Sequence, residues 1–386
     1  MVSARLREVD ALRSFALGGI LMVNIWYFAD PYTLAGAVSP GHQSAADLAV
    51  RFTVAALFEA KFYLLFSFLF GYSFVLQWRA AITATASPVQ RMQRRLAALF
   101  VLGLLHGLFL FFGDILLTYS LMGLILLATQ SLRTSSAVVT GSALIGVLGS
   151  LILAVGLFIA SAGAGAPSAA VPVDPGAITE SAGSAFSSNA DNFLDNVAGV
   201  VFLQGPLSLG MFYLGLAAGR ARLLERRLST RTLTTTAATC LPVGLAAGAF
   251  QAYLTIYGNG DRFSVLAFGI STLTAPLQTA GYVSLLLLLF RTTAGAQICG
   301  LLAPAGRMAL TNYLMQSVIM ALVFTAYGLR LSNGLPAIAV AGIAVVIFVA
   351  QLILSCLLLV RIRTGPAEWL LRRVTYGAPG DRVPGS

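Results

Sequence analysis

Charged residues are scarce in this chain of 386 residues: they make up 10% of the sequence, against 58% hydrophobic residues and a mean hydropathy of +0.86. Soluble domains carry roughly 25% charged residues, so this scarcity excludes an ordinary water-soluble fold. The apolar runs are long and lack the alternation of apolar and polar residues that marks the strands of membrane barrels. The composition therefore predicts an all-α, polytopic transmembrane helical bundle that forms a single domain over residues 1–386.

Cysteine and lysine are rare as well. Cys240, Cys299 and Cys356 lie in or beside apolar runs at no metal-ligand or redox spacing, so we expect neither a disulfide nor a metal site. The formal net charge of +10 comes from arginine, because Lys61 is the only lysine. These arginines lie in short loops between apolar runs, which argues against a nucleic-acid partner and leaves membrane lipids as the expected surroundings.

About ten apolar segments are long enough to cross a membrane, given that a span needs roughly 20 residues. They lie near residues 11–29, 54–77, 95–112, 115–130, 135–163, 197–219, 232–256, 263–290, 300–327 and 336–360.

Arginines gather at alternate ends of these segments, and the positive-inside rule assigns such ends to the cytoplasm. An even number of spans then places both termini in the cytoplasm. The arginines concerned are Arg5, Arg7, Arg79, Arg91, Arg94, Arg95, Arg133, Arg220, Arg222, Arg226, Arg227, Arg231, Arg361, Arg363, Arg372 and Arg373.

Two segments are predicted not to span the membrane. Residues 164–196 are rich in Ala, Gly, Ser and Pro and contain acidic but no basic residues, which predicts a flexible extracytoplasmic loop. Residues 364–386 contain Trp369 close to Glu368, Arg372 and Arg373, which predicts an amphipathic cytoplasmic tail that anchors at the interface.

His106 and Asp114 lie among Leu, Phe and Gly residues in "GLLHGLFLFFGDILLTYSLMG". An ionisable group inside a span costs about 2.5–3.5 kcal/mol on insertion scales, so both residues are candidate catalytic groups. The alternatives are a neutral imidazole bonded to a neighbouring helix and an Asp114 that caps the next helix. On a straight helix, eight residues span about 12 Å and 80°. We therefore expect the two side chains to face one cavity at different depths without bonding directly.

Other polar residues of the spans are candidates for substrate binding. Asp10 and Arg13 are three residues apart, so a local ion pair at the cytoplasmic interface is the plainer interpretation. Lys61 is expected to extend outward to the membrane surface. The helical spacing of polar groups in "GRMALTNYLMQS" predicts that they line a cavity. The candidate substrate-binding residues are Asp10, Arg13, Asn24, Tyr119, Arg307, Asn312 and Gln316.

Five stretches carry a family resemblance: "VDALRSFALGGILMVNI", "KFYLLFSFLFGYSF", "GLLHGLFLFFGDILLTYSLMGLILL", "GRMALTNYLMQS" and "GPAEWLLRRVTYG". In this order they resemble the signatures of the YeiB-like bacterial inner-membrane family, known as domain-of-unknown-function family 418. That resemblance implies a multi-pass protein of the bacterial cytoplasmic membrane.

A more distant resemblance starts from the Asp10-x-x-Arg13 motif and Asn24. This opening is similar to that of the transmembrane acyltransferases, including heparan-α-glucosaminide N-acetyltransferase, which passes acetyl from cytosolic acetyl-CoA to a sugar amine. The essential histidine of that enzyme follows the first span and precedes Val-Ala-Asp-Leu. Here His42 precedes "AADL", so His42 is a rival to His106 as the working histidine.

These observations predict a membrane-embedded acyltransferase that takes an acyl group from acyl-CoA and gives it to a glycan or lipid acceptor. His106 would act as the base, Asp114 would orient the acceptor, and Arg13 would favour the phosphates of the donor. A proton-coupled transporter or exporter is the alternative, because an intramembrane His and Asp also suit proton coupling. A non-catalytic scaffold, in which polar groups only hold helices together, is a third possibility.

Overall fold

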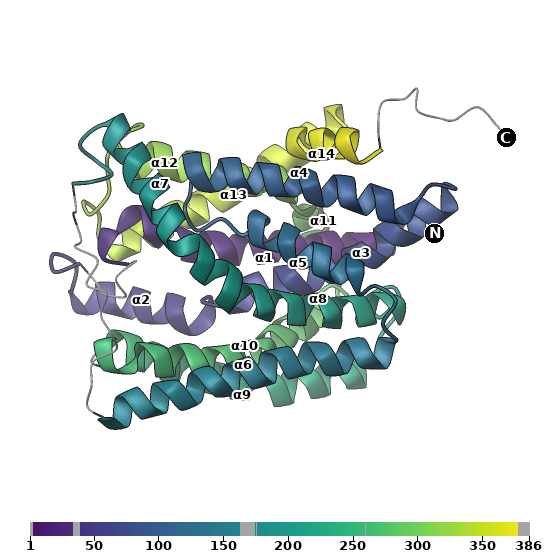
Figure 1. The fold of residues 1–386 in the computed structure, drawn as a ribbon, viewed down its shortest axis with the longest axis horizontal. Coiled ribbons are helices and arrows are strands. Elements are labelled where there is room, and N and C mark those ends of the chain that lie inside the picture. The colour runs from purple at the N-terminus through teal and green to yellow at the C-terminus, as the bar shows by residue number, and fades with distance from the viewer. Residues whose placement is uncertain (1–2, 34–38, 163–173, 175, 259, 377–386) are drawn as a thin grey trace.

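The computed structural model describes all residues except 1–2, 34–38, 163–173, 175, 259 and 377–386. Within the described residues every regular element is a helix, which confirms the all-α class (Figure 1). The elements are α1 (Ser3–Ala29), η1 (Pro31–Thr33), α2 (Ala45–Leu57), α3 (Lys61–Thr83), α4 (Pro88–Phe109), α5 (Leu116–Ala128), α6 (Thr134–Ala162), α7 (Ala182–Gly199), η2 (Val200–Gln204), α8 (Gly205–Arg220), α9 (Thr230–Ile256), α10 (Gly260–Leu289), α11 (Thr293–Arg307), α12 (Ala309–Phe324), α13 (Ala337–Arg361) and α14 (Pro366–Tyr376).

Eight helical segments of the described chain are long and apolar enough to cross a membrane, and the bent pair of α11 and α12 makes a ninth if it counts as one span. The protein is therefore a membrane protein. The pair bends by 78° after Arg307, so the predicted segment 300–327 is a broken helix. The predicted segment 115–130 is α5, whose 13 residues reach about 20 Å and fall short of a hydrocarbon core of about 30 Å. The count of about ten spans stays a prediction.

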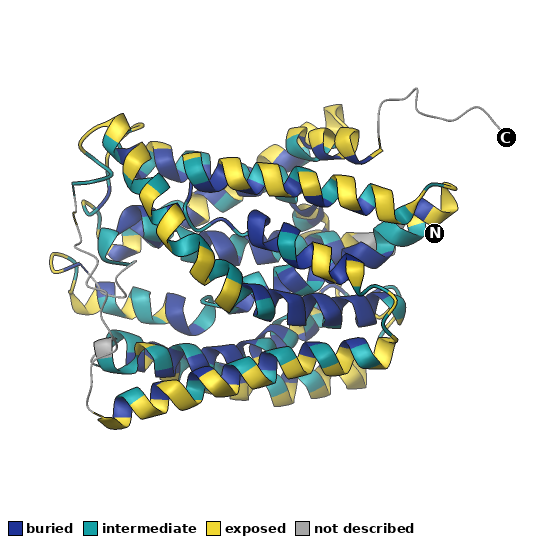
Figure 2. Ribbon diagram, in the orientation of Figure 1, coloured by how far each residue is buried: buried dark blue, intermediate teal, exposed yellow. Residues whose placement is uncertain are grey.

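Helix α1 forms the centre of the bundle. In its most apolar stretch 61% of the residues are buried, against 22% in α9 and in α13. Large apolar side chains on the outer helices remain exposed, among them Phe158 on α6 (73% exposed) and Val346 on α13 (68% exposed). Figure 2 shows this pattern, with exposed positions along the outward faces of α6 and α9. Such faces suit contact with lipid tails, because a helix satisfies its own backbone hydrogen bonds there.

The predicted position of Lys61 is wrong. The side chain is 1% exposed, and its Nζ donates to the carbonyl of Ala55 at 3.1 Å and to Gln251 Oε1 at 3.2 Å. The cause is a break between α2 and α3, which leaves the last carbonyls of α2 without helical partners. Gln278 Nε2 and the Tyr282 hydroxyl donate to the next two carbonyls at 3.2 and 3.0 Å. Lys61 is therefore held inside to satisfy a helix end.

The predicted flexible loop over residues 164–196 is wrong in its second half. Helix α7 begins at Ala182, because the side chains of Ser181 and Ser184 cap its first turn reciprocally. Residues 163–173 lie outside the described residues. In the predicted tail, α14 is an amphipathic helix that packs against α4 and α12, and residues 377–386 lie outside the described residues.

The first turns of α1 and helix α14 lie at the same end of the bundle (Figure 1). Residues from both, Asp10 and Arg372 among them, line one cavity there. Arg220 donates to the carbonyl of Leu132 at 2.5 Å, which brings the α5–α6 connection close to the end of α8. This clustering of arginines at helix ends agrees with the orientation expected from the positive-inside rule. The orientation itself stays a prediction.

Chemical labelling tests that orientation. In a variant without Cys240, Cys299 and Cys356, we expect a cysteine at Ser187 of α7 to react with a membrane-impermeant maleimide in intact cells. A cysteine at Ser131, between α5 and α6, should react only after permeabilisation. Both positions are exposed in the structure, so the side of the membrane on which each one lies decides whether it reacts. Labelling of Ser131→Cys alone in intact cells would contradict the topology.

Candidate functional site

A cavity of about 530 Å³ lies at the end of the bundle that holds α14. Its interior is apolar, with Leu17, Leu99 and Leu116 among its lining residues. Five arginines also line it, and two carboxylates oppose them. The charged lining residues are Arg13, Arg95, Arg307, Arg363, Arg372, Asp10 and Glu368. We call it the basic cavity.

The two carboxylates of the basic cavity already have partners. Asp10 Oδ1 accepts from Arg13 Nη1 at 2.5 Å, as the spacing of the two residues predicts. Glu368 of α14 accepts from the backbone N–H groups of Leu310 and Thr311 at 2.6 and 3.0 Å. These N–H groups lie in the first turn of α12 and have no hydrogen-bond acceptor within the helix. The cavity therefore keeps an excess of positive charge. The Glu368 contacts also hold α14 against the start of α12.

A second cavity, of about 500 Å³, is lined by α7 and by the segment that follows α4. Its floor is aromatic and includes Tyr27, Phe111 and Phe112. Among the described residues that line it, four are acidic and none is basic; the acidic ones are Asp174, Glu180, Asp191 and Asp195. We call it the acidic cavity.

His106, Asp114 and Ser317 form one buried hydrogen-bonded row. His106 Nδ1 lies 2.8 Å from Asp114 Oδ1, and Nε2 lies 2.9 Å from Ser317 Oγ. The three residues are 2%, 3% and 1% exposed. An ionised carboxylate only accepts, so Nδ1 carries the proton and Nε2 of a neutral ring accepts from the serine hydroxyl. The order carboxylate, imidazole, hydroxyl is that of a nucleophile activated by an oriented base.

The expectation that His106 and Asp114 do not bond directly is wrong, because the helix between them is not straight. Helix α4 ends at Phe109 and α5 begins at Leu116, so the chain turns between the two residues. Asp114 Oδ2 also accepts from the Leu117 N–H at 2.8 Å, so the capping role considered for this residue is present as well.

Asn189 of α7 holds this turn from outside. Its Nδ2 donates to the carbonyls of Gly107 and Leu108, each at 2.9 Å, and its Oδ1 accepts from the Phe112 N–H at 2.8 Å. One side chain thus satisfies carbonyls at the end of α4 and an N–H of the turn. The segment predicted to be a flexible loop therefore supports the site.

The row lies between the two cavities. The His106 ring is 5.0 Å from the ring of Tyr313, which lines the basic cavity, and 6.3 Å from the ring of Phe111, which lines the acidic cavity. On α12, Tyr313, Ser317 and Ala321 follow at intervals of four residues, so they share one face at steps of about 6 Å. Ala321 lines the acidic cavity. A layer of one side chain separates the row from each cavity.

The other sequence candidates divide into two groups. Asp10, Arg13, Tyr119 and Arg307 line the basic cavity. Asn24 lines neither cavity; it is half-buried and makes no side-chain hydrogen bond among the described residues.

Asn312 and Gln316 point away from both cavities, toward α11 and α13. Asn312 Nδ2 donates to the carbonyl of Ala305 at 3.1 Å and to Ser355 Oγ at 3.0 Å. Gln316 Nε2 donates to Gln351 Oε1 at 2.8 Å. Asn312 thus satisfies a carbonyl at the break between α11 and α12, and Gln316 joins α12 to α13, so both have structural uses.

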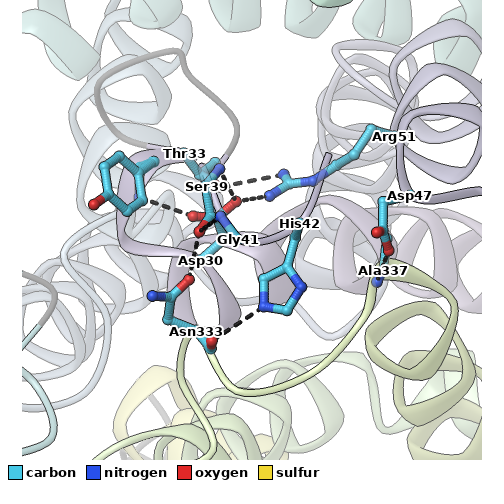
Figure 3. Close-up of polar contacts among 10 residues, drawn as sticks. Asp30, Thr33, Ser39, Gly41, His42, Asp47, Arg51, Asn333 and Ala337 are labelled. Carbon is cyan, nitrogen blue, oxygen red and sulfur yellow. Dashed lines mark hydrogen bonds and ion pairs between the residues drawn. The ribbon is translucent and has the colours of Figure 1, made fainter. Parts of the chain in front are cut away.

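His42 belongs to a different set of contacts. Its Nε2 donates to the carbonyl of Asn333 at 3.0 Å and ties the segment after η1 to the loop before α13 (Figure 3). Asp30 pairs with Arg51 of α2 beside it, and Asp47 accepts from the Ala337 N–H at 2.7 Å. His42 thus takes part in a cross-link between two loops and lines neither cavity.

Ser317 and Tyr313 were not chosen from the sequence, although both lie in the "GRMALTNYLMQS" stretch. Serine and tyrosine are common in spans, and only the fold shows that they face His106. Among the described residues, no group of three or more His, Cys, Asp and Glu side chains could hold a metal ion. Metal independence stays a prediction.

Comparison with known proteins finds relatives that match nearly the whole chain. The family described as "Protein of unknown function (DUF418)" matches residues 218–378. The chain is 30% identical over 391 residues to "Uncharacterized protein YeiB" of Escherichia coli (strain K12), with 97% of each chain covered. It is 28% identical over 403 residues to "Uncharacterized protein YxaH" of Bacillus subtilis (strain 168), with 97% of this chain and 95% of the relative covered. No solved structure matches.

Gly103 of α4 tests the packing that holds Asp114. A Cβ there would lie 2.3 Å from the Leu117 nitrogen and 2.8 Å from Asp114 Oδ2, whereas a Cβ at Gly146 of α6 would meet nothing within 4 Å. We expect Gly103→Ala to destabilise the protein by about 1–3 kcal/mol through overpacking. Gly146→Ala should leave the thermal unfolding temperature in detergent unchanged or slightly raised. Equal unfolding temperatures for both variants would contradict the described turn.

Proposed function

This chain belongs to the YeiB-like DUF418 family of membrane proteins, and for it we propose an acyltransferase activity inside the membrane. The enzyme takes an acyl group from a cytosolic acyl-CoA and gives it to a glycan or lipid acceptor on the other side. One observation supports this proposal above the others: the row of Asp114, His106 and Ser317 lies between a basic and an acidic cavity.

The basic cavity suits the donor. Guanidinium groups recognise phosphates through several directed hydrogen bonds and stay charged at any physiological pH. Arg95, Arg307 and Arg372 line it together with apolar side chains deeper in the bundle. A thioester with phosphates at one end and an acyl chain at the other matches this distribution of charge. The positive-inside rule also favours the cytoplasm for this end, and acyl-CoA is found in the cytoplasm.

The acidic cavity suits the acceptor. Carboxylates accept hydrogen bonds from hydroxyl and amine groups, and aromatic floors stack against sugar rings and amphiphiles. Asp191 and Asp195 of α7 supply such carboxylates, and Phe112 is part of the aromatic floor. An extracytoplasmic hydroxyl or amine that enters here is separated from His106 by the Phe111 ring.

His106 serves as the general base. Asp114 fixes its tautomer, so that Nε2 is free to take a proton from an attacking group. Burial of the row excludes water, which would otherwise hydrolyse the acyl group before transfer. The relatives are bacterial, and we infer the bacterial cytoplasmic membrane as the location.

The two histidines provide a matched test. A strain that lacks the gene is complemented with the wild-type chain, His106→Gln or His42→Gln, and its envelope glycans and lipids are compared by mass spectrometry. We expect an acyl mass increment with the wild type and His42→Gln. With His106→Gln the increment should fall by about 10²-fold or more, because glutamine does not accept a proton at neutral pH.

Two outcomes would overturn the proposal. A full increment with His106→Gln would assign the imidazole a structural role. If no acyl increment depends on the gene, and an intact solute instead crosses the membrane in a gene-dependent manner, the protein is a transporter.

Arg372 and Arg373 are neighbours on α14, and only Arg372 lines the basic cavity. Both are exposed, and the Arg373 guanidinium lies 5.3 Å from the Trp369 ring. We expect Arg372→Gln to weaken acyl-CoA binding to the purified protein about two- to fivefold, as for an exposed charge pair. Arg373→Gln should leave the dissociation constant from isothermal titration unchanged. Equal weakening by both variants would mean that the overall surface charge attracts the ligand and that Arg372 makes no specific contact.

A further inference from the structure

We propose that Ser317 is the nucleophile and carries the acyl group as an ester between the two cavities. This inference rests on the proposed acyl transfer and specifies its pathway: the reaction runs in two steps through acyl-Ser317. Transfer directly from donor to acceptor would leave the serine unmodified.

The hydrogen bonds of Ser317 support this role. Among the described residues its hydroxyl makes one hydrogen bond, to His106 Nε2 at 2.9 Å, whereas several other buried serines of the bundle donate to backbone carbonyls. Ser120 on α5, for example, donates to the Leu117 carbonyl at 2.6 Å and Ser67 on α3 to the Tyr63 carbonyl at 2.8 Å. Ser317 therefore is the serine whose proton is directed at a base that a carboxylate orients.

Tyr313 supplies the second observation. It is one helical turn before Ser317, lines the basic cavity and stands beside the His106 ring. Its hydroxyl is buried and has no hydrogen-bond partner among the described residues. A buried hydroxyl without a partner is costly, so a ligand group that accepts from it is favoured. In the proposed reaction it donates to the carbonyl oxygen of the thioester, where negative charge develops.

The position of Ser317 also explains why a carrier is useful. Tyr313 and Ala321 flank it on the same face of α12, and each lines a different cavity. Tyr313 and Ala321 are eight residues apart, which is about 12 Å along the helix axis. A donor and an acceptor confined to their own cavities do not meet directly. An ester at Ser317 is one turn from either side.

The first step forms the ester. Ser317 Oγ attacks the thioester carbonyl carbon as its proton passes to His106 Nε2. The C–S bond then breaks, and the sulfur of the departing CoA takes that proton. Acyl-Ser317, neutral His106 and free CoA result, and no oxidant or reductant is needed.

The second step releases the acyl group. The acceptor hydroxyl or amine gives its proton to His106 Nε2 as it attacks the ester carbonyl. The bond from that carbon to Ser317 Oγ breaks, and the serine oxygen regains the proton. The cycle returns the row to its starting state.

The test needs no acceptor. The full-length chain in nanodiscs is incubated with acetyl-CoA, butyryl-CoA or palmitoyl-CoA and isotopically labelled free CoA, and exchange of label into acyl-CoA is measured. We expect the wild type to catalyse exchange with at least one donor and to gain one acyl mass on the peptide that contains Ser317. Ser317→Ala should lose both, with exchange reduced roughly 10³-fold or more. Ser120→Ala, the matched control, should stay within about twofold of the wild type.

The variant Ser317→Cys tests whether the loss of exchange in Ser317→Ala is caused only by misfolding. A thiol at this position should accept the acyl group as a thioester that neutral hydroxylamine cleaves, whereas the serine ester should resist that treatment. Exchange or product formation by Ser317→Ala at the wild-type rate would overturn the covalent step. If the wild type shows no exchange and no adduct while the envelope test shows His106-dependent acylation, transfer is direct and only this inference fails. If acylation is absent as well, the proposed function fails with it.

Discussion

The structure depends on a carboxylate and an imidazole that are bonded to each other inside a membrane bundle. An ionised group without a partner in hydrocarbon costs several kcal/mol. Asp114 reaches His106 only because α4 ends and the chain turns before α5. The turn exposes carbonyl and N–H groups, which Asn189 of α7 then satisfies. The turn thus allows the pair to form, and Asn189 links α7 to that turn.

Positive and negative charges lie on opposite sides of this pair. Arginines line the cavity on one side of the row and carboxylates line the cavity on the other. An asymmetry of this kind orients a membrane protein during insertion, and it also favours anionic ligands at the basic end. In the proposed function, orientation and substrate preference share this one physical origin.

Much of the fold was predictable from composition, because long apolar runs have few alternatives in a membrane. That His106 and Asp114 have polar partners was also predictable, since buried ionisable groups are costly. Their direct bond was not, because the segments 95–112 and 115–130 imply a turn between the two residues but do not fix its geometry. Polarity alone also gave the wrong position for the Lys61 side chain. It did not distinguish Gln316, which donates to Gln351 of α13, from Ser317, which faces the histidine. Side-chain direction within a helix depends on how its neighbours pack.

We propose that one buried imidazole connects a donor cavity with an acceptor cavity. A structure of the protein with a thioether analogue of acetyl-CoA, which cannot be transferred, tests this most directly. We expect phosphates beside Arg95 and Arg372, a displaced Tyr313 ring, and a carbonyl carbon within about 3.5 Å of Ser317 Oγ. An analogue bound elsewhere, or one whose carbonyl stays in the basic cavity with Tyr313 still closed over His106, would contradict it.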